Sequence, residues 1–292
     1  YAHHATPEAL LALYDDALAP RLGLPKEAPR TDKLRNAGHR LVEAVAGWDF
    51  TPRFEGRGLD FAPVDLNVNL WLYEQNFVWF ARELALPDGA RWNAAAERRR
   101  AAINRHLWQP RRGLFVDHDG ASGRPSSVAC LATFAPLWAG LATVEQAAAV
   151  VKNLPLFEEA YGVGACARGP RAGARPYQWD HDTAWPHLHI LVVLGLERYG
   201  YHAEARRIAT KFLDAIAKNF VAPTRSDGKR GAGSFAGGAG GVTLGPGRTW
   251  EKYSALDGSL NVAEYGVNEC KQVTPAAATL FARLLGVAPQ AR

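Results

Sequence analysis

The chain has 292 residues, of which 48% are hydrophobic, 10% aromatic and 22% charged. This balance excludes a disordered or fibrous protein, because enough apolar surface is present to offset the conformational entropy lost on folding. The net charge of +5 is small, and the densest basic cluster lies at residues 98–112. No nucleic-acid reader motif accompanies that cluster, so we interpret it as a solvated helix face and expect no nucleic-acid partner.

Three further features of composition narrow the class of protein. The chain contains no Met and begins at Tyr1, which favours a processed or incomplete chain. No run approaches the ~18 apolar residues that span a bilayer, and no signal peptide is recognisable. Cys130, Cys166 and Cys270 have no CxxC spacing and cannot all pair, so we expect buried free thiols. The sequence decides neither the oligomeric state nor between a cytoplasmic and an exported location.

Helical periodicity dominates the chain. The clearest case begins at residue 66, where apolar side chains recur every three or four positions, with Asp65 as the predicted N-cap and Pro87 as the stop. The stretch 186–200 is apolar nearly all round, which predicts a buried helix. The sequence predicts about nine helices; the others cover roughly 7–17, 33–46, 91–107, 127–141, 143–153, 202–220 and 275–286. Residues 113–119 predict a small extended hairpin arm.

Long loops separate these helices. Residues 50–65 and 162–182 lack periodicity but carry aromatic and charged side chains, and we expect them to be functional. The Gly-rich stretch 225–247 is expected to be mobile. Helices that alternate with long loops are typical of an α/α toroid, in which the loops at one end build the site. We therefore expect a single all-α domain over residues 1–292.

Carboxylates next to aromatic side chains form the strongest local pattern. An aromatic ring can stack on the apolar face of a sugar, and the neighbouring carboxylate can bind hydroxyls or transfer protons. An apolar wall also raises a carboxyl pKa, which keeps a general acid protonated. Glycoside hydrolysis generally needs two such carboxyls. The pairs are Trp48-Asp49, Trp179-Asp180, Trp250-Glu251 and Glu264-Tyr265, although each alone also fits chance adjacency.

A metal site is the rival interpretation, because His181, Asp182, His187 and His189 crowd one segment. However, His187 and His189 are two positions apart, so on a helix they point to different faces. No HExxH motif or Cys/His quartet is present, and we expect no metal. A GxSxG nucleophile motif and a phosphate-binding loop are also absent from the sequence.

Four motifs resemble the trehalase family and occur in its order. Residues 47–54 (GWDFTPRF) resemble the family's GWDFSSR(W/F), and residues 62–67 (APVDLN) resemble its PVDLN. Residues 178–186 (QWDHDTAWP) are similar to QWDxPxGWxP. Residues 250–253 (WEKY) and 263–265 (AEY) resemble the family's WEKY…GGGGEY. The resemblance covers roughly residues 30–285 and points to the C-terminal, larger part of a trehalase-family glycoside hydrolase.

This resemblance implies hydrolysis of α,α-trehalose with inversion, on an (α/α)6 toroid and without a cofactor. Asp49 falls on the family's general acid and Glu264 on its general base. The side chains expected to bind the sugar are Arg30, Trp48, Phe50, Arg53, Asn67, Gln178, Trp179, Asp180, Trp185, Trp250 and Tyr265. Because about nine helices are few for a full toroid, we expect a toroid that is incomplete or abbreviated on its N-terminal side.

Departures from the family pattern leave alternatives open. The arginine-bearing PGGRFxExYxWD and NRSQPP-like segments are absent, and Asp182 and His187 stand where proline is usual. A hydrolase of another small α-glycoside, such as glucosylglycerate or mannosylglycerate, is therefore the first alternative. A non-catalytic sugar-binding relative is the second, and a metal-dependent hydrolase built on the histidines is the third.

Overall fold

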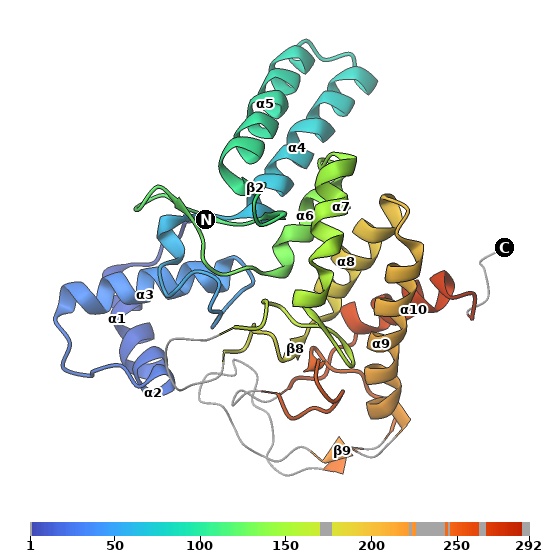
Figure 1. The fold of residues 1–292 in the computed structure, drawn as a ribbon. Helices are drawn as coiled ribbons and strands as arrows, with labels where there is room; N and C mark the ends of the chain where they lie inside the picture. Colours follow the sequence, from blue (N-terminus) through green and yellow to red (C-terminus); the bar gives the residue numbers. More distant parts are fainter. Residues whose placement is uncertain are drawn as a thin grey trace.

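The structure is a computed structural model, and it describes residues 2–169, 177–221, 224–225, 243–244, 246–262 and 267–287. Its elements are mainly helices joined by loops that carry very short strands, which agrees with the predicted all-α class (Figure 1). The predicted mobile loop 225–247 lies almost entirely outside the described residues. Within the described ranges, no helix combines the length and apolarity that a membrane span requires.

The first helices form an N-terminal lobe, which we define as residues 2–46. Its elements are α1 (Pro7–Ala12), the π-helical η1 (Leu13–Leu18), α2 (Ala19–Leu22) and α3 (Arg30–Val45). The side chain of Thr6 caps α1 by accepting from the Ala9 N–H. The lobe has its own small apolar cluster, built on the buried Leu10, Tyr14, Leu18, Ala19 and Ala37. The helix predicted at 7–17 therefore continues to residue 22 through a π-helical turn.

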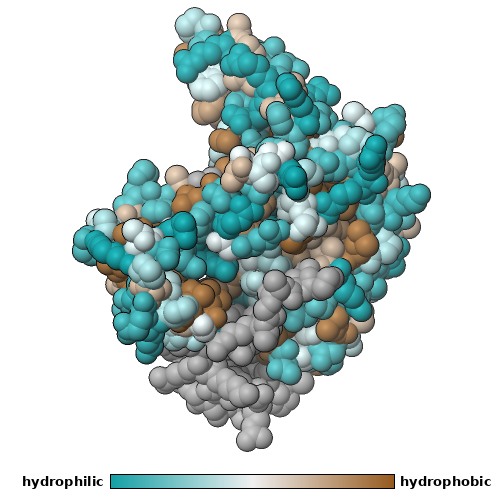
Figure 2. Space-filling view, turned by 60° about the vertical axis from the view of Figure 1, so that its left-hand side comes forward, coloured by the Kyte–Doolittle hydropathy of each residue, from teal (hydrophilic) through white to brown (hydrophobic). Residues whose placement is uncertain are grey.

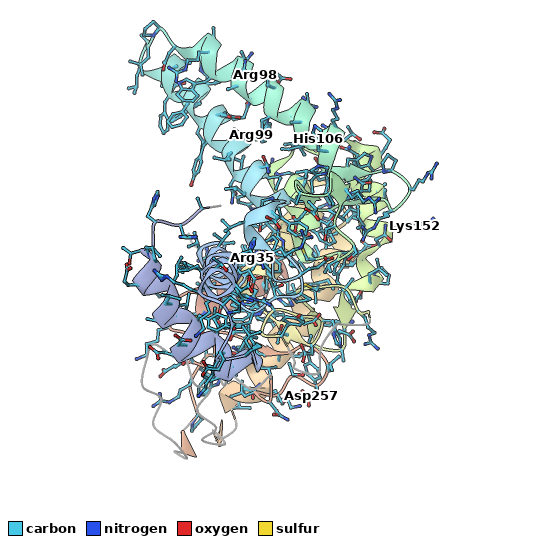
Figure 3. All side chains as sticks on the ribbon, turned by 90° about the vertical axis from the view of Figure 1, so that its left-hand side faces the viewer. Arg35, Arg98, Arg99, His106, Lys152 and Asp257 are labelled. Atoms are coloured by element: carbon cyan, nitrogen blue, oxygen red, sulfur yellow. The ribbon has the colours of Figure 1, made fainter. Side chains whose placement is uncertain are left out.

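Helices α4 (Val64–Glu83) and α5 (Gly89–Ala102) form a hairpin that projects from the rest of the molecule (Figures 1 and 2). Part of the predicted apolar stripe of α4 stays exposed on this arm: Tyr73, Phe77 and Phe80 have exposed fractions of 60%, 43% and 44%. Asp65 is not the N-cap, which is Pro63; its carboxylate instead binds Arg53. The basic cluster begins here, with Arg98 and Arg99 on α5 (Figure 3).

The main apolar core lies among the later helices, with α8 at its centre. The elements are η4 (Leu131–Phe134), α6 (Ala135–Ala139), α7 (Val144–Lys152), α8 (Pro186–Arg198), α9 (His202–Val221) and α10 (Val273–Leu284). Helix α8 packs against α6, α9 and α10, and its Val192, Val193 and Leu196 are fully buried, as the sequence predicted. The helix predicted at 127–141 begins only at residue 131, because Cys130 lies in a β-bridge with Cys166. All three cysteines are free thiols, although Cys270 is only half-buried.

Short antiparallel strands fasten the loops to one another. Strand β1 (Phe61–Ala62) pairs with β4 (His118–Asp119), which pairs with β5 (Arg124–Pro125). Strands β2 (Trp108–Gln109) and β3 (Leu114–Phe115) form the hairpin expected near residues 113–119. Short 3₁₀ turns η2 (Gly58–Asp60) and η5 (Leu154–Leu156) and the π-helical η3 (Ile103–Leu107) complete this region. The remaining pairs are β6 (Glu158–Glu159) with β7 (Gly162–Val163), β8 (Thr183–Ala184) with β11 (Tyr253–Ser254), and β9 (Thr224–Arg225) with β10 (Thr243–Leu244).

Candidate active site

The loop that follows α3 reverses the chain in a strained turn. The Trp48 N–H donates to the Glu43 carbonyl at 2.9 Å, and Gly47 between them has a φ of 72°, which suits glycine. Phe50 also lies in the left-handed region, with a φ of 58°. This conformation costs a bulky residue about 1–3 kcal/mol and persists only where the surroundings enforce it. The strain is therefore located at the residue that follows Asp49.

The Phe50 carbonyl joins two loops that lie far apart in the sequence. It accepts the backbone N–H groups of Gln178 and Trp179, with N···O distances of 2.9 and 3.3 Å. The loop 47–54 is thus bound directly to the loop 177–185. The strained turn accordingly brings together the two motifs that the sequence singled out as GWDFTPRF and QWDHDTAWP.

Asp49 is held at this junction by both of its carboxylate oxygens. Gln178 Nε2 donates to Asp49 Oδ2 at 2.9 Å, and Trp179 Nε1 donates to Asp49 Oδ1 at 3.2 Å. The residue is half-buried, so it remains accessible to a ligand. Within the part of the chain that the structure describes, each oxygen accepts from one of these side chains, which leaves it a second lone pair that can carry a proton. The geometry therefore fixes the orientation of one accessible carboxyl group, as a general acid requires.

Three tryptophan rings form a wall behind the carboxyl group. Trp179 and Trp185 stack with a centroid separation of 3.7 Å and an interplanar angle of 3°, and Trp48 lies 5.4 Å from Trp179. Their exposed fractions are only 4%, 7% and 4% for Trp179, Trp185 and Trp48. The predicted apolar wall beside Asp49 is present. The rings nevertheless present little open face on which a sugar could stack. Their contacts support the loops that hold Asp49.

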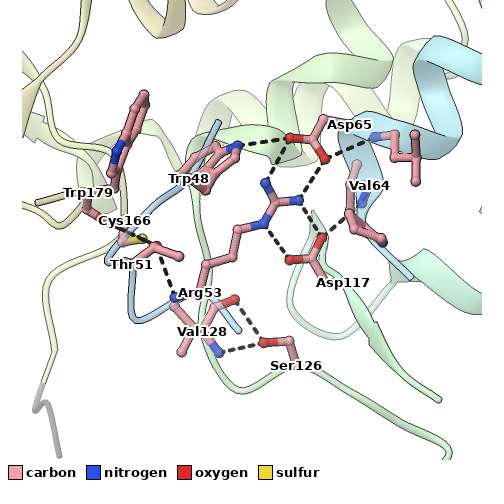
Figure 4. Close-up of polar contacts among 12 residues, drawn as sticks. Trp48, Thr51, Arg53, Val64, Asp65, Asp117, Ser126, Val128, Cys166 and Trp179 are labelled. Carbon is pink, nitrogen blue, oxygen red and sulfur yellow. Dashed lines mark hydrogen bonds and ion pairs between the residues drawn. The ribbon is translucent and has the colours of Figure 1, made fainter. Parts of the chain in front are cut away.

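Arg53 lies within a buried ion-pair network under the same loop (Figure 4). Its Nε and Nη2 donate to the two carboxylate oxygens of Asp117 at 2.6 and 2.8 Å. Its Nη1 and Nη2 donate to those of Asp65 at 2.7 and 2.8 Å. Burial opposes ionisation of Asp65, yet the guanidinium holds the pKa of that carboxyl below its usual range.

The Arg53 side chain has no exposed surface, so it does not offer the predicted contact to a sugar. Its role in this structure is to support the loop. Its guanidinium carbon lies 4.5 Å from the Trp48 ring centroid, and Trp48 Nε1 donates to Asp65 Oδ2 at 3.1 Å. Asp117 Oδ1 also accepts the N–H of Val64 at the start of α4. The network therefore anchors the wall residue Trp48 to the base of the arm.

Two predicted sugar ligands lie elsewhere. Arg30 is the first residue of α3, is 57% exposed and has Glu8 as its ion-pair partner at 3.9 Å. A helix of 16 residues is about 24 Å long, so Arg30 begins α3 at the end opposite to the loop that carries Asp49. The Asn67 amide donates to the Pro63 carbonyl and accepts from Arg99 at 3.4 Å, which commits it to the arm.

Two others are buried structural residues. Asp180 is 5% exposed and accepts the N–H of His181 at 2.8 Å, which stabilises the loop. Trp250 is 3% exposed, and its carbonyl accepts from Thr274 at the start of α10. The predicted general base Glu264 and its neighbour Tyr265 lie outside the described residues. Their motif partner, the WEKY segment, reaches the site through the pairing of β11 with β8.

Two cations near Asp49 were not among the predicted site residues. Lys252 is 1% exposed, with its Nζ 3.5 Å from Glu251 Oε1 and 5.0 Å from the Trp185 ring centroid. Burial lowers the pKa of Lys252, and the Glu251 carboxylate opposes this effect. Its position inside the WEKY motif was the available signal. Arg21 of α2 has Nη2 3.4 Å from Gln178 Oε1, and no motif marks it.

The histidine segment is not arranged as a metal site. His189 Nδ1 lies 2.7 Å from the Trp185 carbonyl, and its Nε2 accepts the Val163 N–H at 2.9 Å. Both ring nitrogens are therefore committed to the backbone. Among the residues that the structure describes, no group of three or more His, Cys, Asp or Glu side chains could hold a metal ion.

Comparison with known proteins gives one consistent result. The model of the Trehalase family matches residues 34–229, which include both loops at Asp49 but neither Arg21 nor Glu264. The chain is 34% identical over 235 residues to a probable trehalase of Saccharomyces cerevisiae, covering 75% of this chain and 29% of that protein. It is 36% identical over 191 residues to the cytosolic neutral trehalase of Kluyveromyces lactis, covering 60% and 25%. The chain thus spans less than a third of the length of these curated relatives.

Solved structures agree on the architecture. Neutral trehalase Nth1 from Saccharomyces cerevisiae matches with a TM-score of 0.68 and 29% identity, over 89% of this chain and 44% of that one. A GH63 mannosylglycerate hydrolase from Thermus thermophilus matches with a TM-score of 0.56 and 17% identity, over 90% and 55%. The second similarity concerns the fold alone. Together they assign the helices to the predicted (α/α)6-toroid class.

Proposed function

The chain belongs to the trehalase family, and from that premise we propose that it hydrolyses α,α-trehalose to glucose with inversion. The observation that carries this proposal is the accessible Asp49 carboxyl group, held by Gln178 and Trp179 where two family motifs meet. The whole protein's substrate is part of the proposal, because the chain spans only 29% of the yeast relative.

In the proposed reaction Asp49 is the general acid and Glu264 the general base. Asp49 gives its proton to the glycosidic oxygen as the bond to the anomeric carbon breaks. Glu264 takes a proton from a water molecule whose oxygen attacks that carbon from the opposite face. Inverting enzymes hold their two carboxyl groups about 6.5–9.5 Å apart so that this water fits between them. Once it has given up its proton, Asp49 is a carboxylate, which the Gln178 and Trp179 N–H groups can stabilise.

The decisive variant is Asp49→Asn, which removes the proton donor and keeps the shape. Loss of a general acid typically costs about 10²- to 10⁴-fold in rate. Glucose release from trehalose should fall by that factor, while Asp32→Asn, which alters an aspartate in an exposed pair with Arg35, should retain the wild-type rate. NMR of the first product anomers should show inversion. Wild-type activity in a folded Asp49→Asn variant would remove Asp49 from the mechanism.

The predicted base and the substrate need separate experiments. Glu264→Gln should lose glucose release to a similar degree, because no other group would then activate the water in the proposed mechanism. A panel containing trehalose, glucosylglycerate and mannosylglycerate distinguishes trehalase activity from hydrolysis of another small α-glycoside. Calorimetry with trehalose tests the non-catalytic alternative, which predicts binding without turnover.

A further inference from the structure

We propose that Arg21 is a positioning residue for Asp49 and that it acts through the Gln178 side chain. This inference rests on the proposed role of Asp49. Arg21 Nη2 donates to Gln178 Oε1 at 3.4 Å, and Gln178 Nε2 donates to Asp49 Oδ2 at 2.9 Å. One amide group therefore connects the arginine to the carboxyl group.

The hydrogen bond from Arg21 determines which way the amide faces. A glutamine amide has an acceptor oxygen and a donor NH2 group at opposite ends of nearly the same shape. Arginine only donates, so it binds the oxygen end of Gln178 and leaves the NH2 group toward Asp49. The reverse orientation would place the Gln178 oxygen against the Asp49 carboxylate and the Gln178 NH2 group against the donors of Arg21. Arg21 accordingly selects the orientation that can stabilise Asp49 after it gives up its proton.

Phe50 fixes Arg21 in place. The guanidinium carbon of Arg21 lies 3.5 Å from the Phe50 ring centroid, a stacking distance that favours a cation over an aromatic face. The Phe50 carbonyl accepts the backbone N–H of Gln178, so Arg21 and Gln178 are both held by contacts with the same residue. Phe50, whose φ of 58° is strained, contacts Arg21 through its ring and the loop 177–185 through its carbonyl.

Arg21 enters from a segment that the family match does not include. The match begins at residue 34, whereas Arg21 lies on α2 of the N-terminal lobe. The lobe's apolar cluster, including the buried Leu18 and Ala19, holds α2 beside Phe50. The contact joins residues 157 positions apart in the chain. Positioning of Asp49 by Arg21 thus comes from the N-terminal lobe, outside the residues that the family model matches.

Kinetics of Arg21→Met test the proposal. Misplacement of a catalytic group by about 1 Å costs on the order of 10²-fold, so kcat for glucose release should fall about 10- to 100-fold while KM changes little. Arg21→Lys should recover part of kcat, because lysine keeps a donor but loses the planar stack. The matched control is Arg35→Met, an exposed arginine of the same lobe (Figure 3), which should leave kcat unchanged.

A double-mutant cycle separates positioning from general stability. If Arg21 acts through Gln178, Arg21→Met should have almost no further effect on kcat in a Gln178→Ala background. Full additivity of the two substitutions would overturn the inference, as would a wild-type kcat in a folded Arg21→Met variant. Asp49→Asn reports on the proposed function independently. If Asp49→Asn is inactive and Arg21→Met is fully active, only the role of Arg21 is refuted.

Discussion

Glu43 is a buried carboxyl group in the last turn of α3, six positions before Asp49. Its side chain has no exposed surface, and Arg40 Nη1 donates to its two oxygens at 3.1 and 3.0 Å. Burial raises the pKa of Glu43 to about 7, although Arg40 opposes the change. The backbone carbonyl of Glu43 also accepts the Trp48 N–H. Glu43 is therefore part of the turn that leads to Asp49.

This raised pKa predicts a pH dependence of stability. Between the ordinary glutamate pKa of about 4.3 and the folded value of about 7, the folded state binds more protons at Glu43 than the unfolded state does. Stability from this group is therefore present at low pH and is lost as the pH rises through that window. Glu43→Gln removes the titration. The difference in free energy of unfolding between Glu43→Gln and wild type should therefore shift in favour of the variant by on the order of 2–3 kcal/mol from pH 5 to pH 7.5.

Urea unfolding at the two pH values measures the Glu43 effect directly. Glu83→Gln is the matched control, because Glu83 lies in an exposed pair with Arg82 and should give the same difference from wild type at both pH values. Equal differences for Glu43→Gln at pH 5 and pH 7.5 would show that Glu43 does not titrate in this range.

At the level of elements, the chain's local patterns predicted most helices and the two loops that meet at Asp49. Helix α8 was recognisable because its apolar residues surround it, and a helix of that kind has to be buried. The exposure of the apolar stripe of α4 could not be predicted, because periodicity identifies an apolar face and does not reveal what covers it. The partners of Arg53 and Arg21 could not be predicted either. Asp117 and Gln178 lie 64 and 157 positions away from them, and no local pattern encodes such contacts.

The attachment of β7 to the loop 177–185 is a sensitive point between elements. A Cβ atom at Gly164 would lie 2.0 Å from the His181 carbonyl oxygen, which is backbone and cannot rotate away. Gly164→Ala should therefore lower the free energy of unfolding by about 1–3 kcal/mol. It should also lower kcat, because His181 is three positions from Gln178 and the shift would reach Asp49.

Gly89→Ala provides the control for Gly164→Ala. At Gly89, the first residue of α5, a Cβ atom would meet only the Ala81 side chain at 3.3 Å. Its effect on stability should stay within about 1 kcal/mol, the range of helix propensity differences between glycine and alanine. Thermal unfolding and glucose release measured on both variants give the comparison. A Gly164→Ala protein as stable as Gly89→Ala would show that the loop 177–185 can move without cost.

At the scale of the whole molecule, two apolar clusters are connected at the candidate site. The smaller cluster lies in the N-terminal lobe and includes Phe50 among its partly buried members, whereas Trp48 and Trp179 belong to the main core. Asp49 thus lies in sequence between a residue of each cluster. The orientation of its carboxyl group depends on how firmly the lobe is packed, since Arg21 comes from one side and Gln178 from the other.

This arrangement predicts that the lobe can open without the core and that opening lowers activity. Leu18 is 2% exposed within the smaller cluster, and Leu→Ala at such a position costs about 2–5 kcal/mol. In Leu18→Ala, hydrogen exchange should accelerate in α1, α2 and α3 but not in α8 or α9. Because α2 carries Arg21, kcat should fall with it. Leu196→Ala, at a fully buried position of α8, should instead accelerate exchange throughout the core. Equal acceleration of α8 exchange in both variants would mean that lobe and core unfold as one unit.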